Sequence, residues 1–218
     1  MKKTTKPLLA ARRRPSQRRS AQLVDAILEA AVRVLGRDGA RRFTTVRVAE
    51  EAGVSVGSLY QYFPSKEALL FRLQTDEWEE TWNVLAEILA DAGSPPRERL
   101  RRAVLAFFRS ERLEAALRVA LDDAGARVHD APEARAHREK ANRSLDAFVG
   151  ELLPGATPAE RAFAADFLMT SMSAVAERIT SEGRTRVEVD ACAKASAEMY
   201  GAWLDTMAIS SEHPGRGA

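Results

Sequence analysis

Residues 43–70 read FTTVRVAEEAGVSVGSLYQYFPSKEALL and contain the signals of two short helices joined by a tight turn. Thr45 is a suitable N-cap for a first helix that continues to Ala52. Gly53 follows at once and tolerates the positive φ that a tight turn requires. The first helix is therefore predicted over residues 45–52.

The second short helix is bounded on both sides by residues that favour helix ends. Ser55 is a good N-cap, and Pro64 cannot continue a helix but favours the start of the next one. The helix is therefore predicted from about Val56 to Phe63. Two short helices around a glycine-containing turn are typical of the helix-turn-helix motif.

Helical periodicity extends outward from this motif in both directions, and no convincing strand pattern interrupts it. Before the motif, a helix that ends at Gly36 and Gly39 carries an apolar face of Leu23, Ile27, Ala30, Ala31, Val34 and Leu35. After it, helices are predicted at about 66–89, 96–111, 112–124, 132–153, 157–182 and 187–208. The predicted fold class is all-α.

The motif resembles, almost residue for residue, the DNA-binding segment of the tetracycline-repressor (TetR) family. The resemblance extends over about Ser20 to Leu73, and it covers the rest of the chain only as architecture. It implies an N-terminal three-helix DNA-binding domain and a helical C-terminal domain that binds an effector and dimerises. The expected organisation is a basic flexible arm (1–19), a helix-turn-helix domain (20–66), an effector-binding and dimerisation domain (67–209) and a flexible tail (210–218).

The second helix of the motif has an inner and an outer face. Leu59 and Phe63 lie four residues apart and are expected to lock this helix against the other two. Glycine within a helix costs about 1 kcal/mol relative to alanine, so Gly57 suggests close approach to a base or sugar. Tyr60 is predicted to read a base. The predicted DNA-binding set is Thr45, Ser55, Val56, Gly57, Ser58, Tyr60, Gln61, Tyr62 and Lys66.

Within that set, Ser58, Gln61, Tyr62, Thr45 and Lys66 are predicted to hold phosphate oxygens. The alternatives are plain N-capping for Thr45 and Ser55, and packing against the second domain for Tyr60 and Tyr62.

Charge along the chain supports a polyanionic partner. Eight of the 33 basic residues precede Asp25 with no acid among them, whereas the remainder carries 25 basic against 31 acidic residues. Such a basic arm is typical of segments that meet nucleic-acid phosphates, although a solubilising tail is the alternative. The basic residues of this arm are Lys2, Lys3, Lys6, Arg12, Arg13, Arg14, Arg18 and Arg19.

The predicted effector is a small organic molecule in the C-terminal domain, because inward-facing aromatic residues gather there. The candidate ligand-binding residues are Trp78, Trp82, Phe107, Phe108, Leu117, His137, Phe148 and Met172. Ordinary core packing is the alternative for each of them. A metal site at His129, Asp130, Glu133 and His137 is disfavoured, because Pro132 interrupts the spacing.

A homodimer is predicted through the last two helices, about 157–182 and 187–208. The first is apolar on two faces, one with Phe163 and Phe167, the other with Leu168 and Met172, which indicates burial on both sides. The alternative is that both faces belong to a monomer core.

Several classes of function are disfavoured. No nucleophile–base pair, paired acid and base or phosphate-binding glycine loop is found, so the chain is not expected to be an enzyme or to carry a cofactor or metal. No apolar run approaches the length of a membrane helix, and the apolar run at Leu8 is too short for a secretory signal. A single cysteine, Cys192, suits the cytoplasm. The expected function is a one-component transcriptional regulator, usually a repressor in this family, that binds a palindromic double-stranded operator and is released by its effector. The alternative is an architectural DNA-binding protein without an effector.

Overall fold

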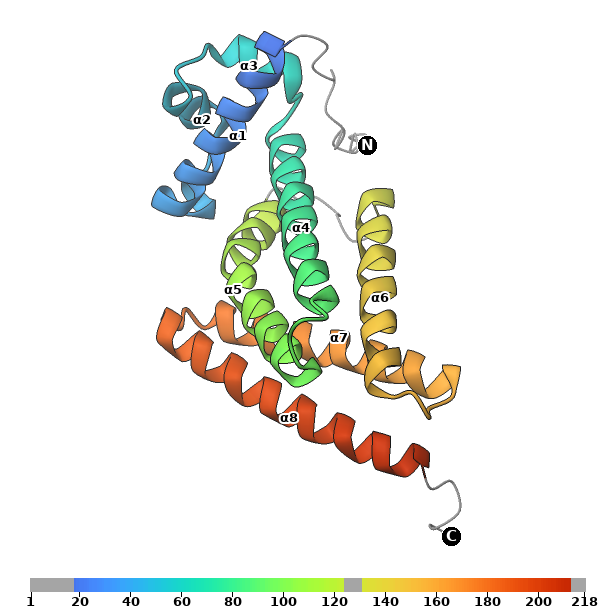
Figure 1. Cartoon of the computed structure of the whole chain (residues 1–218). Helices are drawn as coiled ribbons and strands as arrows, with labels where there is room; N and C mark the ends of the chain where they lie inside the picture. Colours follow the sequence, from blue (N-terminus) through green and yellow to red (C-terminus); the bar gives the residue numbers. More distant parts are fainter. Residues whose placement is uncertain (1–17, 124–130, 213–218) are drawn as a thin grey trace, which may run out of the picture. The chain divides into compact units, whose positions relative to one another are not determined.

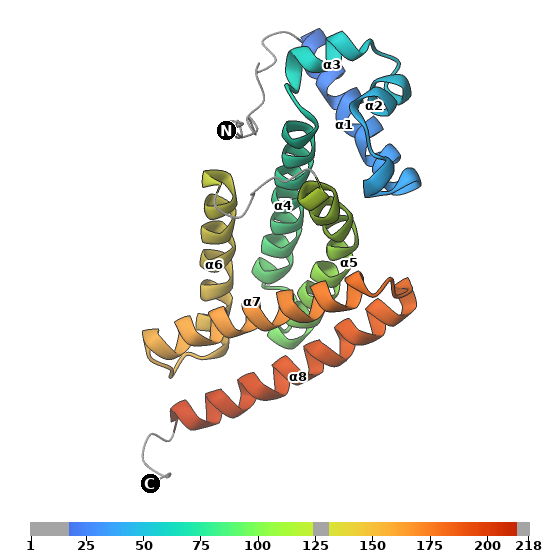
Figure 2. The same cartoon turned by 180° about the vertical axis from the view of Figure 1, so that it is seen from behind.

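The computed structural model describes residues 18–123 and 131–212, and the regular structure in these ranges is helical throughout (Figures 1 and 2). The all-α prediction is confirmed. The described residues form two compact units. The first contains those up to residue 77 together with 113–134, and the second contains 78–112 together with those from 135 onward.

The first unit contains the helix-turn-helix. Its elements are α1 (Arg18–Asp38), the short 3₁₀ helix η1 (Ala40–Arg42), α2 (Thr45–Glu51), α3 (Val56–Tyr62) and the beginning of α4 (Lys66–Ala90). The apolar stripe of α1 is buried against α2 and α3, with Ile27, Ala31 and Val34 inaccessible to solvent. Gly39 and Gly53 both have the left-handed φ expected of turn residues, 74° and 67°.

Several predicted boundaries of this unit shift. Helix α1 runs through Gly36, which has φ in the ordinary helical range, and ends only at Asp38 before Gly39. It also begins at Arg18, two residues before the predicted domain start, and residues 1–17 of the basic arm lie outside the described part of the chain. Helix α4 starts at Lys66, as predicted, and the Ser65 hydroxyl caps it by accepting a hydrogen bond from the Ala68 N–H (3.2 Å).

The second unit is built on the later part of α4, the first part of α5 (Pro96–Asp123), and helices α6 (Pro132–Leu152), α7 (Pro158–Ser181) and α8 (Arg186–Glu212). Helices α7 and α8 lie side by side and run in opposite directions (Figures 1 and 2). They pack on one apolar core that draws on all five helices. Helix α8 continues to Glu212, so the predicted tail from residue 210 begins later, and residues 213–218 lie outside the described ranges.

The prediction of two helices at 96–111 and 112–124 is wrong, because α5 is one continuous helix. No glycine or proline interrupts residues 97–123. Ser110, the residue best suited to cap a new helix there, instead donates its hydroxyl to Phe107 O (2.9 Å), a bond that is compatible with an uninterrupted helix.

A buried arginine joins the ends of three helices in the second unit. Arg99 of α5 donates to Leu89 O near the end of α4 (2.6 Å), pairs with Glu151 near the end of α6 and lies over the Phe148 ring (5.3 Å). The Arg99 guanidinium also lowers the pKa of the Glu151 carboxyl below its ordinary value. These contacts compensate part of the cost of burying the charge and fix the three helix ends together.

Candidate functional site

Helix α3 has the inner and outer faces expected of a reading helix. Ser55 caps it, since its hydroxyl accepts from the Ser58 N–H (3.0 Å) and lies 2.8 Å from the Ser58 hydroxyl. Leu59 and Phe63 are 0% and 1% exposed, as predicted, and they lock the helix into the unit. The capping role of Ser55 is therefore confirmed.

The outer face of α3 is open to solvent at three of the predicted contact positions. Gly57, Tyr60 and Gln61 are exposed, and Val56 and Ser58 are half-buried. A Cβ at Gly57 would meet only the Ser55 hydroxyl, at 3.8 Å, and the φ of Gly57 is not left-handed. Nothing within the unit therefore requires a glycine at position 57, and the backbone there is open to close approach.

Thr45 is placed differently from the prediction. The N-cap of α2 is Thr44, whose hydroxyl accepts from the Arg47 N–H (3.3 Å), so the prediction that Thr45 caps this helix is wrong. Thr45 is buried, and its hydroxyl lies 2.9 Å from the Tyr60 hydroxyl. A hydroxyl held inside the unit is poorly placed for a phosphate, and the contact that the structure shows for it is the one with the Tyr60 hydroxyl.

The prediction that Tyr62 lies on the outer face of α3 is wrong. Its side chain is buried, with 8% of its surface exposed. The reason is helical geometry: residue 62 follows Leu59 by three positions and therefore lies on the same side of α3 as the core residues. This burial argues against the predicted phosphate contact of Tyr62.

Lys66 is the first residue of α4, next to the free N–H groups of that helix. Its ammonium lies 5.8 Å from the centre of the Phe43 ring. The side chain is half-buried by this contact, which holds the cation at the helix N-terminus, where an anion is also favoured.

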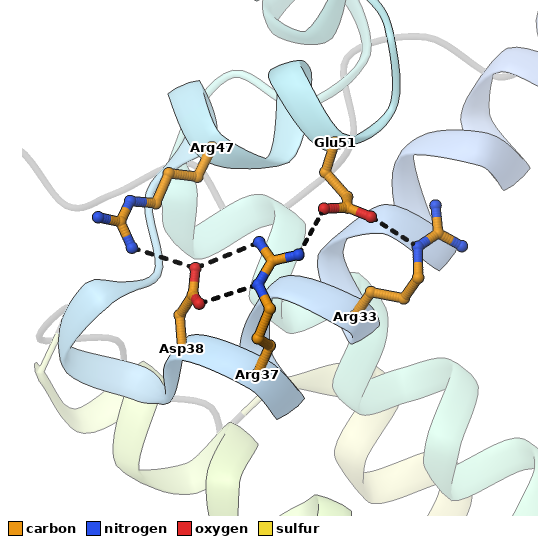
Figure 3. Close-up of polar contacts among 5 residues, drawn as sticks. All are labelled: Arg33, Arg37, Asp38, Arg47 and Glu51. Atoms are coloured by element: carbon orange, nitrogen blue, oxygen red, sulfur yellow. Dashed lines mark hydrogen bonds and ion pairs between the residues drawn. The ribbon is translucent and has the colours of Figure 1, made fainter.

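Two carboxylates and three guanidinium groups connect α1 to α2 (Figure 3). Glu51 accepts from Arg33 (3.0 Å) and Arg37 (2.7 Å), while Asp38 accepts from Arg37 (3.0 Å) and Arg47 (3.1 Å). We call these five residues the α1–α2 ion network. It lies on the surface and therefore contributes modestly and in a salt-dependent way, but it ties α2 to α1 at both ends of α2.

The opposite charges of the network favour the charged form of Asp38, Glu51 and Arg37. Hydrogen bonds from Arg37 are the largest cause that lowers the pKa of the carboxyls of Asp38 and Glu51. The same carboxylates, Asp38 first, raise the pKa of Arg37. Sequence reasoning missed this network, because the residues that it joins between α1 and α2 are 9 to 18 positions apart and only the packing of α2 on α1 brings them together.

The second unit contains an internal cavity of about 30 Å³. All five of its helices contribute walls, and the lining is apolar apart from two side chains with a polar group, Trp82 and Tyr200. The lining residues are Trp82, Leu85, Leu89, Leu100, Ala103, Val104, Leu145, Leu168, Met169, Met172 and Tyr200.

Of the predicted ligand-binding residues, Trp82 and Met172 line this cavity. Phe107, Phe108 and Phe148 are buried in the same core but are not among the lining residues. Leu117 is buried in the other unit, Trp78 is half-buried away from the lining, and the side chain of His137 lies outside the described part of the structure.

Tyr200 was missed as a ligand-binding candidate, because its spacing on α8 suggested the dimer face. Its side chain is 1% exposed, and its hydroxyl has no hydrogen-bond partner. Burial raises the pKa of this hydroxyl, an effect that Ser171 opposes. Ser171 donates its own hydroxyl to Phe167 O (2.6 Å). A buried polar group without a partner costs about 1–3 kcal/mol.

The faces of α7 and α8 that point away from the core carry an aromatic cluster of the exposed Phe163 and Phe167 and the half-buried Trp203. The Phe167 and Trp203 rings are 4.8 Å apart between centroids, and Phe163 lies 6.1 Å from Phe167. Phe163 is 60% exposed and Phe167 41%, and the neighbouring Met199 is 55% exposed. Helix α7 thus has the two apolar faces that its sequence predicts, one in the core and one at the surface.

The described residues show neither a membrane-spanning helix nor a cluster of metal ligands. Within residues 18–123 and 131–212, no helix is long and apolar enough to cross a membrane. Among the side chains that the structure describes, which do not include those of Glu133 and His137, no group of three or more His, Cys, Asp or Glu is placed to hold a metal ion. His129 and Asp130 of the disfavoured metal set lie outside the described ranges.

Comparison with known proteins places the chain in a family. The profile of the bacterial regulatory proteins of the tetR family matches residues 27–73, and the profile of the tetracyclin repressor-like C-terminal domain matches residues 95–207, over half of the chain. The HTH-type transcriptional regulator BetI of Burkholderia thailandensis is 34% identical over 97 residues, 44% of this chain and 48% of that protein. The chain thus spans about half the length of this curated relative.

Solved structures show the same fold over more of the chain. A transcriptional regulator from Pseudomonas aeruginosa PAO1 superposes with a TM-score of 0.64 at 19% identity, covering 89% of this chain and 94% of that one. A TetR transcription regulator from Haloarcula marismortui gives 0.64 at 19% identity, covering 83% and 96%. The N-terminal profile lies within the first unit, and the C-terminal profile covers residues of both units. The chain therefore belongs to the tetracycline-repressor (TetR) family of transcriptional regulators.

Proposed function

We propose that this protein is a ligand-responsive transcriptional repressor of the cytoplasm, which binds a palindromic operator as a homodimer and leaves it when a small organic effector binds. The observation that carries the proposal is the outer face of α3: Tyr60 is 41% exposed and tied to the buried Thr45, while Gly57 leaves the backbone open. On this face the tyrosine side chain is held in place and the backbone at Gly57 is open, so a helix of this kind can approach base edges in the major groove.

In this proposal the contacts divide into two classes. Tyr60 and Gly57 read bases, whereas Lys66, Ser58 and Gln61 hold the phosphate backbone. Ser55 and Val56 lie at the start of the reading helix, the end that enters the groove in this motif. Thr45 acts through Tyr60.

The homodimer brings two reading helices to one operator, because each helix-turn-helix reads half a site. The exposed aromatic cluster on α7 and α8 supports this part of the proposal, since a large apolar surface patch marks an interaction site.

Effector release follows from the continuity of α4. This helix begins at Lys66 in the DNA-binding unit and reaches Leu85 and Leu89 in the cavity wall without interruption. A ligand that displaces the wall therefore acts on the same helix that carries Lys66. The coupling must be reciprocal, so operator DNA weakens effector binding by the same factor.

The alternative, an architectural DNA-binding protein, would need no effector-binding domain, and the match of residues 95–207 to the tetracyclin repressor-like C-terminal domain favours the ligand-responsive regulator.

The test begins with selection of binding sites from random duplex DNA by the wild-type protein. We expect a two-fold-symmetric sequence whose half-sites are spaced by about one helical turn or a multiple of it. Tyr60→Ala should then lose about 1–3 kcal/mol and relax the preference at one position, whereas Lys66→Ala should weaken all sequences and lower the salt slope by about one. Lys194→Ala, an exposed lysine on α8, is the matched control. Selection of no symmetric site, or unchanged affinity of Tyr60→Ala, would contradict the proposal.

A further inference from the structure

The hydroxyl groups on the outer face of α3 already have partners within the protein. The Tyr60 hydroxyl lies 2.9 Å from the Thr45 hydroxyl. The Ser58 hydroxyl lies 2.8 Å from the Ser55 hydroxyl, and both separations are hydrogen-bonding distances. Because these hydroxyls are directed at neighbouring side chains, few groups on this face are free to form hydrogen bonds with base edges.

Helix α3 also lacks most of the side chains that form hydrogen bonds with base edges. Residues 56–62 read VGSLYQY and contain no arginine, lysine, asparagine, aspartate or glutamate. In the major groove, arginine and lysine pair with guanine, asparagine and glutamine with adenine, and acidic side chains with cytosine. Gln61 is the single amide of α3, and the proposed function places it on the phosphate backbone. The one basic residue of α2, Arg47, is bonded to Asp38 (3.1 Å) in the ion network.

The outer surface of α2 and α3 instead presents apolar side chains. Val46 is 48% exposed, Tyr60 is 41% exposed, and Val56 is half-buried. Val56 and Tyr60 lie four residues apart, so they are neighbours on one face of α3. Val46 directly follows Thr45, whose hydroxyl meets that of Tyr60, so the start of α2 brings Val46 close to the same tyrosine. We call Val46, Val56 and Tyr60 the apolar trio.

The major groove offers one apolar feature that such side chains can contact. Thymine carries a methyl group at C5 that projects into the groove, whereas guanine, adenine and cytosine present hydrogen-bonding groups there. Contact between this methyl group and an apolar side chain removes both from water and is favourable. The open backbone at Gly57, where a Cβ would meet only the Ser55 hydroxyl at 3.8 Å, allows the start of α3 to come close to the base edges.

We propose that Val46 and Val56 determine part of the sequence specificity of this protein by packing, together with the Tyr60 ring, against thymine methyl groups in each half-site. This inference rests on the proposed function and deepens it, because it names the feature of the bases that is read. It implies that the operator has A·T pairs at the positions that the two valines contact. Removal of a methyl group there weakens binding without any change in base pairing.

The experiment scans the operator that the wild-type protein selects from random duplex DNA. Each thymine of one half-site is replaced in turn by deoxyuridine, which lacks only the 5-methyl group and keeps the Watson–Crick hydrogen bonds. Fluorescence anisotropy measures the dissociation constant of each duplex at one fixed salt concentration, because affinity for DNA depends strongly on salt. At the contacted positions each replacement should weaken binding about two- to tenfold, the range expected for one buried methyl group. At the other positions it should have no effect.

A second series of duplexes separates the methyl group from the rest of the base pair. At a contacted position, T·A is replaced by C·G, with either cytosine or 5-methylcytosine in the strand that carried thymine. The two duplexes differ by one methyl group, so the duplex with 5-methylcytosine should bind about two- to tenfold more tightly. This comparison distinguishes recognition of the methyl group from recognition of the adenine on the other strand.

Two truncations of the protein connect the methyl groups to the valines. In Val46→Ala and in Val56→Ala the effect of deoxyuridine should disappear at one position each, because the side chain that contacted the methyl group is shortened. Val84→Ala is the matched control, since Val84 is 43% exposed on α4 in the second unit and its truncation should leave the effect of deoxyuridine at full size. Far-UV circular dichroism must show that each variant remains helical.

Four results would overturn the proposal: a selected half-site in which no replacement by deoxyuridine has an effect, equal affinity for cytosine and 5-methylcytosine, an effect of deoxyuridine that persists at full size in both Val46→Ala and Val56→Ala, or loss of that effect in Val84→Ala. Failure of the proposed function gives a different result. If no symmetric site is selected, the regulator and the methyl reading both fail. A symmetric site that is insensitive to deoxyuridine leaves the regulator standing and overturns the methyl reading alone.

Discussion

Replacement of Phe163 by aspartate should dissociate the homodimer. Phe163 is 60% exposed on the surface of α7, at the edge of the aromatic cluster with Phe167 and Trp203. A phenylalanine side chain offers roughly 200 Å² of surface, so about 120 Å² per protomer becomes buried in the dimer, which at about 25 cal/mol per Å² contributes about 3 kcal/mol.

Because the substitution is present in both protomers of a two-fold dimer, the loss of association free energy is at most about 6 kcal/mol. This corresponds to an increase of roughly four powers of ten in the dimer dissociation constant. Buried area converts incompletely into affinity, so we expect a weakening of at least about a hundredfold. Sedimentation equilibrium at micromolar concentration measures it directly.

Val119→Asp is the matched control, because Val119 is 52% exposed on α5 and is not a member of the cluster. It introduces the same charge and should leave the dimer intact. Far-UV circular dichroism must show that Phe163→Asp remains helical. A folded Phe163→Asp protein that still sediments as a dimer with unchanged affinity would refute the reasoning, as would a wild-type protein that is monomeric at the same concentration.

Three further predictions concern the two units separately. Thr45→Val should lower affinity for the selected operator about two- to tenfold in fluorescence anisotropy, because it frees Tyr60 from its hydrogen bond; unchanged affinity would remove the orienting role. The folded state lowers the pKa of Glu51 from its ordinary value of 4.5, so its stabilising contribution is present above that pH and is lost as pH falls through the folded pKa. Glu51→Gln should therefore flatten the decline of melting temperature below about pH 4.5, whereas Glu50→Gln, on the exposed side of the same helix, should not; equal slopes would contradict this. Gly201→Ala should be neutral or stabilising by up to about 1 kcal/mol, because alanine favours the helix and its Cβ displaces only the end of the flexible Arg97 side chain; a clear drop in thermal stability would show that the Arg97–Asp205 pair matters more than its exposure suggests.

Local signals were sufficient for much of the DNA-binding unit. Ser55 as a cap, Gly53 as a left-handed turn residue, and Leu59 and Phe63 as core all follow from residue type and helical spacing, and all are confirmed. These properties depend on neighbours within four residues, so the sequence contains them directly.

Choices between two nearby candidates were less certain. Thr44 and Thr45 are equally good caps in isolation, and burial of Thr45 beside Tyr60 selects Thr44. Tyr62 was assigned to the wrong face because its polar hydroxyl outweighed its position three residues after Leu59. The break predicted within α5 is wrong, because no glycine or proline lies between residues 97 and 123 to end the helix.

The sequence by itself determined that this chain is all-helical, that a helix-turn-helix lies near its N-terminal end, and which face of α3 is buried. Only the tertiary structure decided the ion network between α1 and α2, the cavity walls and the burial of Tyr200 without a partner. Periodicity shows which side of a helix is apolar. It does not show what that side meets, because residues that share a wall, such as Trp82, Leu145 and Tyr200, come from helices far apart in the chain and are brought together only by packing.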